Sequence, residues 1–138
     1  FCAGSFSAGE HNDCVAMAKQ FADRTHFVHL RSCYIFPNGN FTEASHLGGR
    51  GHLIELCRIF EKAEKEGKCN SGRRLPMRVD HGMTFTDEPG GVFDESNHGH
   101  NAGYTLLGRM FAMGQIQGVI ATVDDELGIE YKQPGFYD

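Results

Sequence analysis

The sequence lacks several features that would place it in a class at once. It has no basic stripe, and its 13 Lys and Arg against 18 Asp and Glu leave a formal net charge of −5, so nothing favours binding to a phosphate backbone. It has no unbroken apolar run near the roughly 18 residues of a membrane helix, and no signal-peptide pattern. We therefore expect neither nucleic acid nor a membrane as a partner.

The cysteines lack a pairing pattern as well. There are five of them, an odd number, and no two form a Cys-x-x-Cys motif; they are scattered as Cys2, Cys14, Cys33, Cys57 and Cys69. Disulfide frameworks and zinc ribbons use regularly spaced pairs of cysteines. The pattern therefore predicts reduced thiols and a cytoplasmic location.

An initiator Met is also absent. The chain begins at Phe1-Cys2, and this start already has the pattern of a strand end. Its 138 residues fit one domain at most. We expect the chain to be the C-terminal part of a longer polypeptide.

The segment 75–82 is the most informative part of what is present. An apolar lead-in runs into Arg78, Asp80 and His81, and Gly82 is expected to let the chain turn away without a Cβ clash. Asp is a hard oxygen ligand for a divalent metal, and His is either a ligand or an acid–base group near neutral pH. This is how a buried strand ends in an active site. A strand that ends in a polar turn with a helix-capping Asp explains the same motif equally well.

The rest of the chain alternates between short apolar runs and amphipathic segments. In the first half, the pattern predicts a strand tip that opens into a loop at 1–7, a helix over 13–23 with Asn12-Asp13 as its N-cap, a strand over 26–31, a loop or short hairpin at 32–41, and a helix that follows Gly49 and ends at Gly67. In the second half, it predicts a strand over 75–80, a loop over 83–101, a helix from about 103 to 123, and an acidic surface tail at 124–138. The charged run Glu61, Lys62, Glu64, Lys65 and Glu66 is expected to be a solvated helix face.

Strands separated by amphipathic helices predict parallel βαβ units. Polar residues gather where these strands end, at Cys2, at His29 with Arg31, and at Asp80 with His81. The carboxyl ends of the strands are where (β/α)8 barrels keep their sites. Three units cannot close such a barrel, which takes about 250 residues. The expected fold is α/β, the last three βα units of a TIM (β/α)8 barrel over 1–138, with the N-terminal half supplied by the same or a companion chain.

Two of the strand-end residues have more than one interpretation. Cys2 is either a small buried hydrophobe, the usual role of a free cysteine, or a thiolate ligand. His29 is either a hydrogen-bonded structural residue or a metal ligand. Arg31 alternates with His29 on the same strand face, and Arg suits an anionic carboxylate substrate.

Several motifs, in one register along the chain, resemble a known family. They are Phe-Cys-Ala-Gly-Ser at 1–5, His-Phe-Val-His-Leu-Arg at 26–31, Phe-Thr-Glu-Ala-Ser-His-Leu-Gly-Gly at 41–49, Arg-Val-Asp-His-Gly at 78–82, and Asn-Ala-Gly-Tyr-Thr at 101–105 followed by Gly108-Arg109. Together they resemble the C-terminal part of the mannonate dehydratase family, metal-dependent barrels of the xylose-isomerase-like group. Val79 and Ala102 stand where the family has Pro.

The resemblance implies a site. Family members bind a divalent Mn or Fe ion through a Cys, two His and an Asp, which would make Cys2, His29 and Asp80 three of the ligands and place the other His before residue 1. By the same resemblance His81 and Tyr104 take the acid–base roles, and the substrate-binding candidates are Arg31, Arg78 and Asn101.

The resemblance also implies a reaction, the dehydration of D-mannonate to 2-keto-3-deoxy-D-gluconate in hexuronate catabolism. The expected partners are a small sugar-acid substrate, the missing half of the barrel and further copies of the same protein. Two alternatives stay open at this stage: an inactive metal-binding or structural fragment, and a related sugar isomerase. The 138 residues alone are expected to be inactive.

Overall fold

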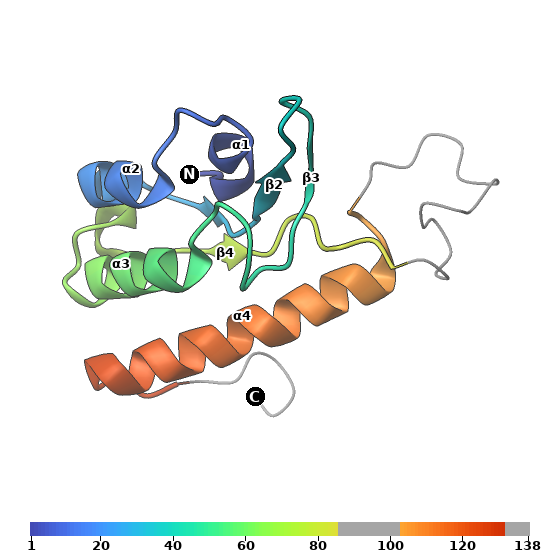
Figure 1. Ribbon diagram of the computed structural model, residues 1–138. Coiled ribbons are helices and arrows are strands. Elements are labelled where there is room, and N and C mark those ends of the chain that lie inside the picture. The colour runs from blue at the N-terminus through green and yellow to red at the C-terminus, as the bar shows by residue number, and fades with distance from the viewer. Residues whose placement is uncertain (86–102, 132–138) are drawn as a thin grey trace.

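The computed structural model describes residues 1–85 and 103–131, which form the mixed α/β arrangement of Figure 1. In chain order the elements are α1 (Ala3–Ser7), α2 (Cys14–Phe21), η1 (Ala22–Arg24), β1 (Val28–His29), β2 (Cys33–Ile35), β3 (Phe41–Glu43), α3 (Leu53–Lys65), η2 (Asn70–Gly72), β4 (Met77–Arg78) and α4 (Leu106–Leu127). Asn101, most of the predicted loop 83–101 and the end of the predicted tail lie outside the described residues.

A small parallel sheet carries the strand ends. In β1 and β4, Val28 lies opposite Met77 and His29 opposite Arg78, and Cys2 adds an isolated parallel bridge to His29. β2 and β3 form a separate antiparallel pair, which confirms the predicted hairpin. The parallel arrangement of the three strand ends is confirmed, while their position in a barrel stays a prediction.

Local sequence explains α2 and α3. The Asp13 side chain caps α2 by accepting hydrogen bonds from the Val15 and Ala16 amides, both at 3.0 Å. Along α3 the buried residues recur at helical spacing, and they are Leu53, Leu56, Cys57, Phe60 and Ala63. Gly67, with φ of 65°, follows the C-terminal end. The predicted helices, caps and buried face are therefore confirmed.

The N-terminal segment departs from the prediction. Residues Ala3–Ser7 form the helix α1 instead of a loop, with Cys2 as its N-cap. The Ser5 amide donates to the Cys2 Sγ at 3.5 Å, and the Ser5 hydroxyl donates to the same sulfur at 3.2 Å. A thiol is an unusual cap, so the pattern of small residues gave no helix-start signal. The loop assigned to this segment was wrong.

The C-terminal helix also departs from the prediction. α4 runs along α3 and β4 (Figure 1) and continues to Leu127, past the predicted end near Val123. Asp124, assigned to a surface tail, lies within the helix and is only 6% exposed. Glu61 and Glu64 of α3 are partly buried beside it, lining the same groove. The solvated face predicted for this run was therefore wrong at both glutamates, because α4 covers them.

Burial has an electrostatic consequence at this helix contact. It raises the pKa of Glu61 to about 7, and the charges of Asp124 and Glu64 act in the same direction while Arg74 opposes them. Burial also raises the pKa of Asp124. At neutral pH Glu61 is therefore only partly ionised.

We expect the stability of the chain to fall as the pH rises from about 4.5 to about 7. In this window the folded Glu61 still holds its proton while the unfolded one, with a pKa of 4.5, has lost it. The folded state therefore binds more protons, and its stability falls with pH by roughly 2 kcal/mol. Urea unfolding at pH 5 and pH 8 measures the fall. Glu61→Gln should abolish most of it, whereas Glu66→Gln, at the exposed C-cap of the same helix, should retain it.

Among the described helices, α4 is long and apolar enough to cross a membrane by length and composition. It has 22 residues, a window of mean hydropathy 1.2, and 22% of that window is buried. The sequence did not suggest such a helix, because Gln115 and Gln117 interrupt its apolar run, although its mean hydropathy is still high enough. A single helix of this kind is weak evidence, since core helices pass the same test.

Candidate metal centre

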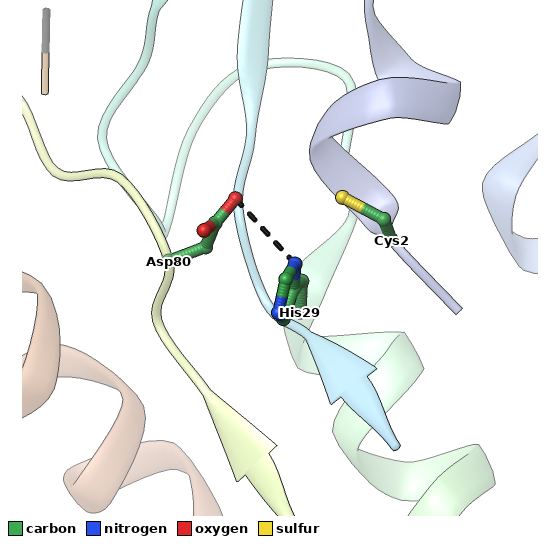
Figure 2. Close-up of side chains that lie close together, drawn as sticks. All are labelled: Cys2, His29 and Asp80. Carbon is green, nitrogen blue, oxygen red and sulfur yellow. Dashed lines mark ion pairs between the residues drawn. The ribbon is translucent and has the colours of Figure 1, made fainter. Parts of the chain in front are cut away.

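Three strand ends bring together a thiol, an imidazole and a carboxylate. One ligand atom each from Cys2, His29 and Asp80 lies within 4.8 Å of the other two. Figure 2 shows the Asp80 carboxylate to the left and the Cys2 sulfur to the right of the His29 ring nitrogen. The His29 Nδ1 is 3.7 Å from the Asp80 Oδ2. The three residues proposed as ligands therefore share one site.

The backbone explains how Asp80 reaches this site. Asp80 adopts φ of 59°, a left-handed conformation that Asp tolerates better than most residues. The left-handed residue of this segment is therefore Asp80 and not Gly82. Gly82 serves another purpose, since a Cβ there would lie 2.3 Å from the Gly108 carbonyl oxygen of α4. The strand end and the helix can approach closely only because both positions are glycine.

The surroundings of His29 favour the form of its side chain that binds metal. Asp80 is 5% exposed. Burial lowers the pKa of His29, although the charge of Asp80 acts in the opposite direction. A lowered pKa keeps the imidazole neutral, which is the form that binds metal. The two hydrogen bonds from Ser5 fix the position of the Cys2 sulfur at the edge of this group.

His81 and Tyr104 lie directly beside this group. The Tyr104 hydroxyl donates to the Asp80 Oδ1 at 3.2 Å. The rings of His81 and Tyr104 meet edge to face, with centroids 4.3 Å apart. The His81 Nε2 is 3.9 Å from the Asp80 Oδ2. Both acid–base candidates therefore lie next to Asp80, one of the three candidate ligands.

Glu43 joins the site although the sequence assigned it no role. Its carboxylate accepts from the Arg31 Nε at 2.8 Å and from the Arg31 Nη2 at 2.5 Å. The same carboxylate lies 3.0 Å from the His81 Nδ1. Its place in the 41–49 motif was visible, but its partners are distant in sequence and no local pattern connects them. Glu43 holds the partly buried Arg31 and the candidate acid–base histidine together.

The three substrate-binding candidates have different surroundings. The Arg31 side chain is 14% exposed and makes the bidentate pair with Glu43. The Arg78 side chain is 42% exposed, with its Nη2 3.5 Å from the Asp80 Oδ1. Arg78 is therefore the more accessible arginine, and Arg31 is better placed to hold Glu43. Asn101 lies outside the described residues.

Comparison with known proteins decides the family. The family model described as "D-mannonate dehydratase (UxuA)" matches residues 1–129. The chain belongs to the mannonate dehydratase family. This confirms the resemblance carried by the sequence motifs.

The mannonate dehydratase relatives are considerably longer than this chain. It is 38% identical over 128 residues to mannonate dehydratase 2 of Agrobacterium fabrum, covering 91% of this chain and 30% of that protein. It is 36% identical over 125 residues to the mannonate dehydratase of Saccharophagus degradans, covering 89% of this chain and 30% of that one. The chain thus spans about 30% of the length of these curated relatives.

A solved structure supports the fold. The crystal structure of mannonate dehydratase from Streptococcus suis serotype 2 matches with a TM-score of 0.69 at 19% identity. The match covers 99% of this chain and 36% of that one. The chain is therefore a mixed α/β unit that matches part of a mannonate dehydratase structure.

Proposed function

We propose that a polypeptide containing this chain removes water from D-mannonate to give 2-keto-3-deoxy-D-gluconate. The observation that carries the proposal is the convergence of Cys2, His29 and Asp80 with His81 and Tyr104 at one strand end. Family membership supports it, because the relatives are mannonate dehydratases. We also propose that the chain is the last part of a (β/α)8 barrel whose remaining units complete the site.

The donor set fits a divalent Mn or Fe ion. A carboxylate suits Mn²⁺, and imidazole with thiolate suits Fe²⁺. Cys2, His29 and Asp80 would hold the ion, with further donors from outside this chain. When bound, the ion would supply positive charge next to the substrate carboxylate and the C2 hydroxyl, where negative charge develops.

The elimination of water needs two proton transfers. A base removes the proton on C2, which is weakly acidic because it lies next to the carboxylate. An acid gives a proton to the C3 hydroxyl, which leaves as water. The resulting enol loses the proton of its C2 hydroxyl, takes up a proton on C3 and becomes the 2-keto-3-deoxy product. His81 and Tyr104 are suited by type and position to these transfers, each of which contributes about 10²–10⁴-fold.

Glu43 determines which nitrogen of His81 faces the reaction. An ionised carboxylate only accepts hydrogen bonds, so a proton on the His81 Nδ1, 3.0 Å away, would be the one that faces Glu43. In the neutral ring the lone pair then lies on Nε2, the nitrogen nearest to Asp80. Arg78, the more exposed of the two arginines, is placed to meet the substrate carboxylate.

Replacing Glu43 with Gln should lower kcat by about 10–100-fold while the metal content stays unchanged. The amide keeps the size of the side chain but no longer selects one tautomer of His81, so kcat should fall more than KM rises. Steady-state kinetics over a pH series with metal analysis measures this. Glu10→Gln, at an exposed position away from His81, is the matched control. Equal kcat in both variants would remove Glu43 from the proposal.

The activity is tested with the chain alone and with the remainder of the fold supplied by co-expression. Formation of a 2-keto-3-deoxy acid from D-mannonate supports the proposal only if it needs the remainder of the fold and a divalent metal. Aldose–ketose interconversion without dehydration would favour the sugar isomerase. Metal binding without turnover in the assembled protein would favour the inactive fragment.

We also propose a reducing, cytoplasmic location for this polypeptide, and the five free cysteines support it.

A further inference from the structure

A buried histidine lies next to the metal centre, and the proposed reaction does not use it. His46 is 2% exposed and lies in the segment between β3 and α3. Its Nε2 is 3.0 Å from the Val79 carbonyl oxygen. A carbonyl oxygen only accepts hydrogen bonds, so Nε2 carries the proton and donates it. His46 therefore binds the peptide group that joins Val79 to Asp80.

This hydrogen bond lies where the backbone pairing of β1 and β4 stops. The Leu30 amide donates to the Arg78 carbonyl at 2.7 Å. A continued parallel ladder would next join the Asp80 amide to the Leu30 carbonyl, and no such bond occurs among the described residues. Burial lowers the pKa of His46, and hydrogen bonding to the backbone of Val79 and of Leu30 acts in the opposite direction. The imidazole thus contacts the ends of both strands at the point where their own ladder is interrupted.

The peptide group that His46 binds leads directly into the left-handed residue. Asp80 has φ of 59°, a conformation that costs free energy for a residue with a Cβ. The angle φ describes the rotation between the Val79–Asp80 peptide and the rest of Asp80, so a fixed peptide constrains where the carboxylate points. Such a conformation persists only where its surroundings determine it. The hydrogen bond from His46 is a constraint of this kind, and it also satisfies the carbonyl of Val79, a residue that is 7% exposed.

The segment that carries His46 is itself held in place. The Ser32 hydroxyl donates to the Gly48 carbonyl at 2.7 Å. The Gln115 Nε2 of α4 donates to the Ser45 hydroxyl at 3.2 Å. The neighbours of His46 on both sides are therefore fixed, one to the end of β1 and the other to a helix. A donor fixed in this way can orient the group that it binds.

We propose that His46 is a positioning residue of the metal centre. By donating to the Val79 carbonyl it keeps Asp80 in the left-handed conformation and so keeps the carboxylate at the site. The inference rests on the proposed function, because it concerns how one ligand of that centre is placed. Glu43, at the end of β3 in the same stretch of chain, lies 3.0 Å from the His81 Nδ1. One short stretch thus contacts both the backbone before Asp80 and the side chain of His81.

Two variants separate the hydrogen bond from the bulk of the ring. His46→Leu keeps a side chain of similar size and removes the donor, whereas His46→Gln retains an N–H that can reach the same carbonyl. Crystal structures of the assembled protein without metal give the first result. We expect Asp80 to lose its left-handed conformation and its hydrogen bond with Tyr104 in His46→Leu, and to retain both in His46→Gln. An unchanged Asp80 in His46→Leu overturns the inference.

Metal affinity gives the second result. His46→Leu should weaken Mn²⁺ binding in titration calorimetry by about 10–100-fold, the effect of removing an outer partner of a ligand. His46→Gln should bind as tightly as His26→Leu, the matched control at an exposed position. In an Asp80→Asn background, His46→Leu should add little, because both changes act through the same carboxylate. An equal further loss in that background overturns positioning through Asp80.

Circular dichroism verifies that each variant is folded. Where His46→Leu does not fold, His46→Asn takes its place, because its shorter amide does not reach the Val79 carbonyl. Neither readout records turnover. A displaced Asp80 and weaker Mn²⁺ binding in His46→Leu, without dehydration of D-mannonate by the unmodified protein, would support the role of His46 and overturn the reaction. Dehydration by the unmodified protein, with Asp80 unchanged in His46→Leu, would do the reverse.

Discussion

Replacing His81 with Asn is expected to lower kcat for mannonate dehydration by about 10²–10⁴-fold while leaving the bound metal in place. Asn can still donate a hydrogen bond to Glu43, so the local packing is retained. It cannot accept or deliver a proton near neutral pH. The measurement is kcat with D-mannonate in the assembled protein, together with metal content per chain. KM should change little, because His81 is assigned no role in holding the substrate carboxylate.

His26→Asn is the matched control for this variant. His26 is exposed and its ring contacts Asn70, away from the metal centre. It should keep normal kcat and normal metal content. Normal turnover in His81→Asn would show that the proton transfers belong to other groups. Loss of metal together with activity would instead make His81 a part of the metal centre.

The part of the site that could be predicted from sequence follows from one geometric rule. The residues that end neighbouring parallel strands lie at the same edge of a sheet. Cys2, His29 and Asp80 each end an apolar or strand-like segment, so the order of residues alone was enough to predict their convergence. The structure confirms that they meet. Their identity as ligands remains a proposal that only metal binding can test.

The residues that sequence analysis missed depend on contacts between distant segments. Glu43 meets Arg31 and His81 because the β2–β3 hairpin folds over the strand ends. Glu61 looked like part of a solvated face, yet α4 covers it and Asp124 lies against it. Helical periodicity shows which face is polar, but it does not show which polar residues a later helix will bury.

The two findings on carboxylates have different consequences. Glu43 lies at the C-terminal ends of the strands and is satisfied by Arg31 and His81. Asp124 lies on α4 and keeps one oxygen unpaired among the described residues. A satisfied buried carboxylate orients its partners, whereas an unsatisfied one indicates that a partner is missing.

Replacing Asp80 with Asn should lower the affinity for Mn²⁺ or Fe²⁺ by more than about 100-fold, beyond the roughly 10–100-fold effect of removing an outer partner. Asn tolerates the left-handed backbone at this position, so the turn should persist. Its amide lacks the negative charge that a hard divalent ion needs. Titration calorimetry with Mn²⁺, and circular dichroism to verify folding, measure the two effects separately. Asp23→Asn, at an exposed site, is the matched control.

The thiol provides an independent test of the same centre. Cys2→Ser exchanges a soft sulfur donor for a hard oxygen, so affinity for Fe²⁺ or Zn²⁺ should fall more than affinity for Mn²⁺. The Ser5 hydrogen bonds can be kept by the new hydroxyl, which limits the structural change. Asp80→Asn should instead weaken all of these ions. If both variants bound every ion as tightly as the Asp23→Asn chain, the three residues would be neighbours without being ligands.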